Sequence, residues 1–176
     1  TYLGLHCTPA NRLSPLAHHL SSMTNAFIVG SKRTAFGSFG GKLSNITAAQ
    51  LGGYAAKAAL AQLPANTPVS STVFGVVAHT DHTAPYTSRH VGHYAGLPIN
   101  VPALTINRLC GSGFQAVINA IHEIKVGDSD VVLTGGTENM SMSPYTLHGV
   151  RFGNTRYGVC LLYTSDAADD MQCGDL

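Results

Sequence analysis

Residues 107–115 read NRLCGSGFQ and place Cys110 between an apolar stretch and a turn of small residues. The preceding segment, 101–106 (VPALTI), is apolar and rich in β-branched residues, which is typical of a buried strand. Over 113–126 the apolar side chains recur at helical spacing. The sequence therefore predicts that a strand ends just before Cys110 and that a helix over 113–126 begins just after it.

This position gives the Cys110 thiol the surroundings of a nucleophile. A thiol at a helix N-terminus faces the positive end of the helix dipole and unpaired backbone N–H groups, which favour the thiolate. Such N–H groups, including that of Cys110, can also stabilise an oxyanion formed when the sulfur attacks a carbonyl. Cysteine is nevertheless among the most buried residue types and often behaves as a small hydrophobe. The spacing alone is equally compatible with an inert core thiol and with a nucleophile.

The wider motif resembles the active-site segment of the thiolases and is most similar to the 3-ketoacyl-CoA thiolases, also called acetyl-CoA C-acyltransferases. The likeness covers about residues 25–153 and rests on several stretches: 27–37 (FIVGSKRTAFG), 86–92 (YTSRHVG), 103–107 (ALTIN), 135–145 (GGTENMSMSPY) and 150–153 (VRFG). One stretch departs from the family pattern. Val76 and His79 stand where the family has Asn and Gln, a difference that bears on substrate preference.

The resemblance implies a two-step acyl transfer. Cys110 would attack the keto carbon of a 3-oxoacyl-CoA, carbon–carbon cleavage would release acetyl-CoA, and CoA would then take the acyl group from the cysteine thioester. The reverse reaction is a Claisen condensation. CoA is thus a co-substrate, no cofactor or metal is bound, and acyl-CoA and CoA are the partners. A full-length parent is expected to be a homodimer or homotetramer in the cytoplasm, or in the mitochondrial matrix of a eukaryote.

Two catalytic motifs of the family do not occur in the 176 residues. Thiolases take a base from a His in a Gly-His-Pro context and a second acid/base from a Cys in a Cys-x-Gly-Gly-Gly context. No histidine that is present matches that base: the candidates are His79, His82, His90, His93, His122 and His148. His90 and His93 lie three apart on a predicted helix, but without a third ligand the pattern favours ordinary histidines over a metal site. The chain alone is therefore predicted to be inactive.

Three alternatives remain open. The parent could be a biosynthetic thiolase that forms acetoacetyl-CoA, a ketoacyl synthase, or a non-catalytic half-domain that binds an acyl-CoA or a partner. The context NRLCGSG at 107–113 argues against the synthase.

Composition excludes other classes of protein. The chain is 44% hydrophobic and 11% charged with a formal net charge of +1, which argues against a nucleic-acid surface. No apolar run approaches the ~20 residues that a membrane-spanning helix needs.

The two ends differ from the middle of the chain. Residues 1–22 show neither helical nor strand periodicity, so we expect a disordered segment that is either untranslated upstream sequence or a leader. Residues 160–176 begin CLLYTSDAAD, which looks like a translated sequencing adapter, and we expect them to be non-native. Residues 23–159 then form an incomplete thiolase N-terminal domain with Cys110 as its sole cysteine, which fits a reducing compartment.

Strands and helices are predicted to alternate along this domain. The expected strands are 26–30, 73–78, 102–107 and 131–134, and the expected helices are 47–63, 86–95 and 113–126. The first helix starts at a capping box, Thr47 to Gln50, and Pro64 ends it. The alternation predicts an α/β fold with a mostly parallel sheet covered on both faces.

The resemblance places this fold as the N-terminal half of a five-layer αβαβα architecture, whose sheet is expected to expose an apolar face that the other half would cover.

Two glycine pairs are predicted to let backbones approach closely. Gly52 and Gly53 lie inside the first helix, where close helix packing would compensate their low helix propensity. The turn 135–138 (GGTE) favours close approach over phosphate binding, because no P-loop lysine follows it. Met140 and Met142 are expected to pack near that turn. Lys32 and Arg33 are either steering groups for anionic CoA or, more often in such turns, simply solvated.

Overall fold

The computed structural model describes residues 2–6 and 25–145. It contains a sheet whose strands lie in the order β2-β1-β5-β3-β4. The strands are β1 (Tyr2–His6), β2 (Phe27–Lys32), β3 (Ser71–Gly75), β4 (Ala103–Ile106) and β5 (Val131–Gly136). The helices are α1 (Ala48–Leu60), α2 (Thr87–Ala95) and α3 (Ser112–Val126), with short 3-10 turns at Ala84–Tyr86 and Met140–Met142.

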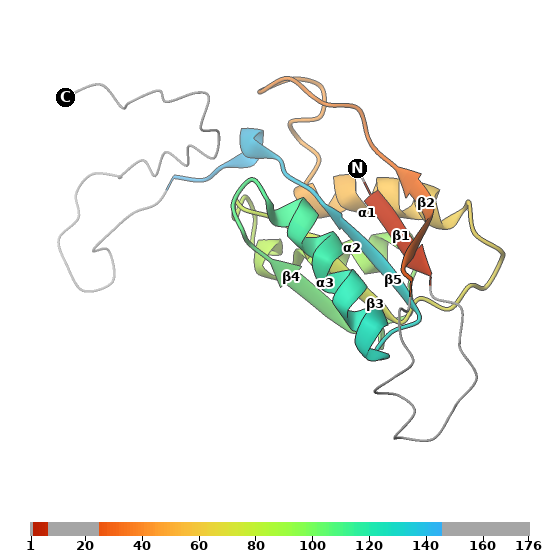
Figure 1. Ribbon diagram of the computed structural model, residues 1–176. Coiled ribbons are helices and arrows are strands. Elements are labelled where there is room, and N and C mark those ends of the chain that lie inside the picture. The colour runs from red at the N-terminus through yellow and green to blue at the C-terminus, as the bar shows by residue number, and fades with distance from the viewer. Residues whose placement is uncertain (1, 7–24, 146–176) are drawn as a thin grey trace, which may run out of the picture.

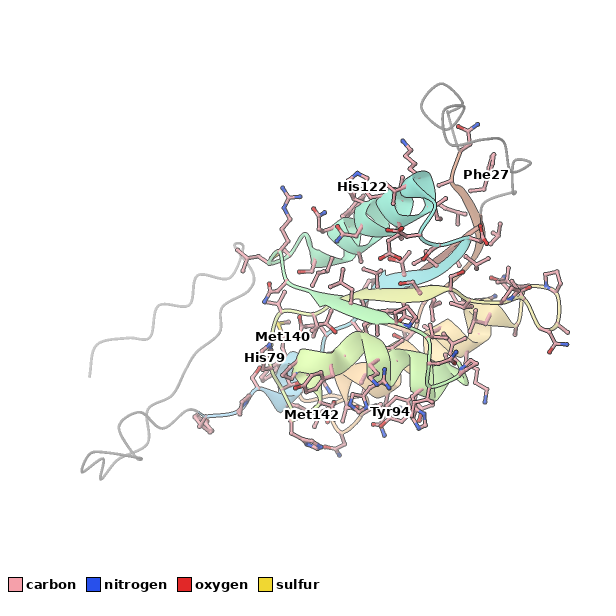
Figure 2. All side chains as sticks on the ribbon, turned by 90° about the horizontal axis from the view of Figure 1, so that it is seen from below. Phe27, His79, Tyr94, His122, Met140 and Met142 are labelled. Carbon is pink, nitrogen blue, oxygen red and sulfur yellow. The ribbon has the colours of Figure 1, made fainter. Side chains whose placement is uncertain are left out.

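The helices cover both faces of this sheet. Helix α3 lies on one face, and α1 and α2 lie together on the other (Figure 2). Strand β3 pairs in parallel with β4 and with β5, whereas β1 runs antiparallel to both of its neighbours. Four strands therefore point the same way, and the prediction of a mostly parallel α/β sheet covered on both faces is confirmed.

Strands β3 and β5 separate two apolar clusters. Val73 and Val132 pack against α3, and Phe74 and Leu133 pack against α1 and α2. All four side chains are at most 1% exposed. Neighbouring residues of a strand point to opposite faces, so an apolar strand covered on both sides contributes to both clusters.

Strand β1 corrects the expectation for the N-terminal segment. We predicted no regular structure over 1–22, yet Tyr2–His6 forms a strand between β2 and β5. Leu3 pairs with Ser31 on one side and with Thr134 on the other. A gap between two strands leaves backbone donors and acceptors to be satisfied, and an extended segment can fill it with little sequence signal of its own. Whether these residues are native stays a prediction.

The exposed apolar surface also differs from the expectation. Helix α3 covers the middle of the sheet face that we expected to be bare, and outward side chains of α3 are themselves exposed: Phe114 is 83% and Val126 is 71% exposed. The third helix packs Ala116 and Ala120 onto β3 and β5. Apolar side chains of the two edge strands stay 38–58% exposed, so the expectation of exposed apolar sheet holds only there: Phe27, Ile28 and Val29 of β2 and Leu104 of β4.

Helix boundaries follow local chemistry. The capping box is present: Gln50 N donates to Thr47 Oγ1 (3.2 Å), and Thr47 N donates to Gln50 Oε1 (3.0 Å). Helices α2 and α3 end at Gly96 and Gly127, which adopt φ values of 90° and 85°. Helix α1 stops at Leu60 instead of Leu63, because a tighter turn replaces its last part, with Gln62 N donating to Ala59 O.

Candidate active site

Cys110 lies in the turn between β4 and α3, as predicted. Its residue is exposed, Gly111 is the N-cap of α3, and the helix begins at Ser112. Leu109, immediately before the cysteine, has a φ of 50°, a left-handed conformation that costs a non-glycine residue about 1–2 kcal/mol. The surrounding turn must therefore hold Leu109 in place.

Ser112 closes this turn with its side chain. Its Oγ accepts a hydrogen bond from Arg108 N (2.8 Å) and donates one to Leu109 O (2.6 Å). Asn107 adds a further bond, because its Oδ1 accepts from Leu109 N (3.0 Å). The two residues that precede the cysteine, Arg108 and Leu109, are therefore held by side-chain hydrogen bonds.

Glycines allow the first turn of α3 to lie directly on the strand ends. A Cβ atom on Gly75 would come within 2.5 Å of the carbonyl carbon of Ser112, and one on Gly136 would lie 3.0 Å from Gly113 Cα. The predicted close approach at the GGTE turn is thus confirmed for Gly136. The contact sets the height of α3, and so of the Cys110 turn, above the sheet.

Cys110 borders a cavity of about 900 Å³ at the carboxyl ends of β3 and β5. This is the edge where open α/β sheets usually bind ligands. Figure 2 places His79, Met140 and Met142 at this end of the sheet and Phe27 at the other. The lining is largely apolar and includes Phe36, Phe39, Leu43, Leu51, Val76, Val77, Leu109, Phe114, Val117 and Met140. A cavity of this size and lining suits an acyl group or another apolar segment of a ligand.

Glu138 is the acidic side chain among the residues that line this cavity. Its carboxylate oxygens accept hydrogen bonds from Val77 N (2.9 Å) and Ala78 N (3.2 Å). Burial raises the pKa of Glu138 above its ordinary value of 4.5, against the lowering effects of these two hydrogen bonds and of His79. The carboxyl group thus holds the loop that follows β3.

Asn139 holds a second wall of the cavity. Its Nδ2 donates to the carbonyl oxygens of Ser44 (3.0 Å) and Ile46 (2.7 Å), while its Oδ1 accepts from Ser141 N (3.1 Å). Sequence reasoning singled out the GGTE turn for its glycines and missed these roles of Glu138 and Asn139. A signal was present, since polar residues directly after a buried parallel strand lie at the ligand-binding edge.

None of the five described histidines that we considered, His79, His82, His90, His93 and His122, is among the residues lining the cavity. His148 lies outside the described residues. Within the described ranges, no group of three or more His, Cys, Asp and Glu side chains is placed to hold a metal ion. The described cavity lining supplies a thiol and a buried carboxyl group, and none of these five histidines belongs to it.

The remaining predicted positions divide into lining and outer residues. Arg33 lines the cavity, stacks over Phe36 at 4.4 Å from the ring centroid and donates to Thr34 O (3.0 Å), whereas Lys32 does not line it. Val76 is buried in the lining, whereas His79 is exposed. Of the two methionines, Met140 lines the cavity and is 46% exposed. Met142, which was predicted to pack near the same turn, is partly buried.

In the described part of the chain, no helix combines the length and hydropathy needed to cross a membrane.

Comparison with known families agrees with this geometry. A family model described as the N-terminal domain of thiolase matches residues 26–173. The chain belongs to the thiolase family. The match runs past Val159, so the expectation that 160–176 are non-native stays a prediction.

Curated relatives of this thiolase chain include enzymes of several names. Human mitochondrial 3-ketoacyl-CoA thiolase is 48% identical over 135 residues, which cover 76% of this chain and 34% of the relative. The beta-ketothiolase BktB of Cupriavidus necator is 42% identical over 127 residues, covering 72% of this chain and 32% of the relative. The chain thus spans about a third of the length of the relatives it matches.

Solved structures give the same result for the fold. The crystal structure of human mitochondrial 3-ketoacyl-CoA thiolase in complex with CoA aligns with a TM-score of 0.71 at 48% identity, covering 79% of this chain and 36% of that one. The acetyl-CoA acetyltransferase of Bacillus anthracis aligns with a TM-score of 0.66 at 34% identity, covering 72% of this chain and 32% of that one. The thiolase-like fold predicted from the sequence is confirmed.

Proposed function

We propose that this chain is part of an acetyl-CoA C-acyltransferase that cleaves a 3-oxoacyl-CoA with CoA and that Cys110 is its nucleophile. One observation carries the proposal: the Cys110 turn, held by Ser112 and Asn107, borders a largely apolar cavity at the carboxyl edge of the sheet. The identity to 3-ketoacyl-CoA thiolases supports the same assignment.

In the proposed reaction the Cys110 sulfur forms a bond to the keto carbon of the substrate. The carbon–carbon bond then breaks, and the acetyl-CoA fragment leaves with the electron pair and takes up a proton. The acyl group remains on sulfur as a thioester, close in energy to the CoA thioester that forms when the CoA thiol displaces Cys110. We propose the backbone N–H of Cys110 as a donor to the oxyanion of the first step. We propose that the base and the second acid/base come from another part of the parent, since the 176 residues contain neither a Gly-His-Pro nor a Cys-x-Gly-Gly-Gly motif.

The proposed partners follow from the substrates and the relatives. CoA and acyl-CoA are the small molecules bound, and a relative crystallised in complex with CoA supports this choice. We propose no metal ion as part of this site. For a eukaryotic parent, the mitochondrial relatives support the mitochondrial matrix, and a homodimer or homotetramer stays the proposed assembly.

Two other functions are favoured by specific observations. Identity of 44% to an acetyl-CoA acetyltransferase of Cupriavidus necator supports a biosynthetic thiolase that forms acetoacetyl-CoA. A non-catalytic half-domain that only binds its ligand is supported by five described histidines that lie outside the cavity lining: His79, His82, His90, His93 and His122.

The test begins with the complete coding sequence, recovered without the sequencing adapter that residues 160–176 resemble. The encoded parent is then assayed for thiolysis of 3-oxoacyl-CoA substrates of increasing chain length. We expect turnover by the parent, none by the chain 1–176, and loss of turnover in the parent on Cys110→Ala. An inactive parent that nevertheless binds CoA would favour the half-domain, and turnover by the chain 1–176 would contradict the need for a second half.

A further inference from the structure

A chain of hydrogen bonds joins Glu138 to the turn that carries Cys110. Val77 N donates to Glu138 Oε2 (2.9 Å), and Val77 O accepts from Asn107 Nδ2 (3.3 Å). Asn107 Oδ1 in turn accepts from Leu109 N (3.0 Å). Three loops of the cavity rim, after β5, after β3 and after β4, are therefore linked in series.

Each link requires the residue that is present. Glu138 uses both carboxylate oxygens, since Ala78 N donates to Oε1 (3.2 Å) while Val77 N donates to Oε2. A Gln side chain has one carbonyl oxygen and so could satisfy only one of these two donors. Asn107 uses its amide in both senses, as donor to Val77 and as acceptor from Leu109, which neither Asp nor Ala can do.

The last link acts on a strained residue. Leu109 holds a φ of 50° directly before Cys110, and such backbone persists only where the surrounding structure determines it. Ser112 fixes the carbonyl side of Leu109, and Asn107 fixes its N–H. Whatever holds Asn107 therefore contributes to the direction in which Cys110 faces the cavity.

We propose that Glu138 is a positioning residue for Cys110, acting through the backbone of Val77 and the side chain of Asn107. The coupling itself is a property of the fold. That it serves catalysis rests on the proposed role of Cys110 as the nucleophile. Burial of the Glu138 carboxyl is costly unless donors compensate it, and the Val77 and Ala78 N–H groups are those donors.

Hydrogen exchange and thiol alkylation test this coupling in the chain 1–176 without any enzyme assay. We would compare the wild type with Glu138→Gln, Asn107→Asp and the double variant, and use Asp130→Asn, at an exposed carboxylate, as the control. Iodoacetamide labelling is followed by mass on the tryptic peptide 109–125, which contains Cys110 and no other cysteine. Amide exchange is read at Val77, Ala78 and Leu109, with Val73 and Leu133 as reference positions in the core.

We expect Glu138→Gln to lower protection at Val77, Ala78 and Leu109 while Val73 and Leu133 keep theirs, and to slow alkylation of Cys110 about twofold or more. The direction is informative. Iodoacetamide is uncharged, so loss of the Glu138 charge gives no electrostatic reason for slower labelling, and a slower reaction identifies geometry as the cause. The double variant should be less than additive, because both substitutions break the same chain.

Three results would overturn the proposal: loss of protection confined to Val77 and Ala78 with an unchanged alkylation rate, faster alkylation, or additive effects of the two substitutions. If Glu138→Gln does not fold, Asn107→Asp tests the same chain from its other end. It should then lower protection at Val77, and unchanged protection there would equally overturn the proposal. An inactive parent enzyme would leave these readouts untouched, so failure of the proposed function is distinguishable from failure of the coupling.

Discussion

Helices α1 and α2 cross at Gly53 on one face of the sheet, whereas the first turn of α3 meets the other face at Gly75. At the crossing, a Cβ on Gly53 would lie 2.3 Å from Tyr94 Cβ, an atom whose position the backbone of α2 fixes. At the α3 contact, a Cβ on Gly75 would lie 2.5 Å from the carbonyl carbon of Ser112, a backbone atom. The two contacts are about equally tight, and since the backbone fixes the position of a Cβ, each can relax only if a helix moves: α2 at the first contact and α3 at the second.

This difference separates a contact that only stabilises from one that also positions chemistry. Gly53 and Tyr94 are not among the residues that line the cavity, while Gly75, Ser112 and Cys110 all belong to it. A displacement of α3 would carry the Cys110 turn with it (Figure 1). We therefore expect substitutions at both contacts to lower stability, but only the one at Gly75 to change the reactivity of the thiol.

The largest effect is expected for a substitution at Gly75. For Gly75→Ala we expect the free energy of unfolding to fall by about 3 kcal/mol, the upper end for overpacking, because backbone atoms of α3 cannot rotate away. Urea unfolding measures this loss, and iodoacetamide labelling of folded protein should show slower reaction at Cys110. Gly113→Ala is the matched control, since its Cβ would meet its nearest neighbour at 3.8 Å, an ordinary contact.

Gly53→Ala tests the contact between α1 and α2. An exposed helical site gains about 1 kcal/mol from this change, but here overpacking against Tyr94 should reverse the sign and leave a net loss of about 1–2 kcal/mol. The labelling rate of Cys110 in the folded protein should not change. A gain in stability would mean that α2 yields easily, and a slower thiol would mean that the two contacts are not separate.

The smallest effect is expected in the pH dependence of stability at Glu138. Its raised pKa means that the folded protein keeps this proton after the unfolded chain has lost it, so its contribution to stability falls as pH rises from 4.5 to the raised value. The stability of the wild type relative to Glu138→Gln should accordingly decline across that window. Urea unfolding at a series of pH values measures it, with Asp130→Asn as the control for surface charge, and a flat or rising difference contradicts the burial of this carboxyl.

Local features of the fold could be predicted from the sequence. The capping box at Thr47, the helix stops at Gly96 and Gly127, and the close packing at Gly53 each depend on neighbouring residues or on the absence of a Cβ. The position of Cys110 between β4 and α3 was predictable for the same reason, because a strand pattern ends and a helical pattern begins on either side of it.

Features that depend on distant partners could not be predicted. Tyr2–His6 forms a strand because β2 and β5 leave a place between them, which no periodicity within five residues signals. Glu138 and Val77 are 61 residues apart, and Asn107 and Val77 are 30 apart, so their hydrogen bonds follow from topology. The histidines also show that residue counts do not locate a site, since none of the five described ones that we considered lines the cavity.

The most direct test of the central claim is to trap the acyl-enzyme. The complete parent would be mixed with a 3-oxoacyl-CoA in the absence of free CoA, quenched in acid and digested. The mass of the peptide 109–125 would then be measured by mass spectrometry. We predict an added acyl mass on Cys110, removed when CoA is supplied. An active parent whose peptide stays unmodified, or whose turnover survives Cys110→Ala, would contradict the role of Cys110 as the nucleophile.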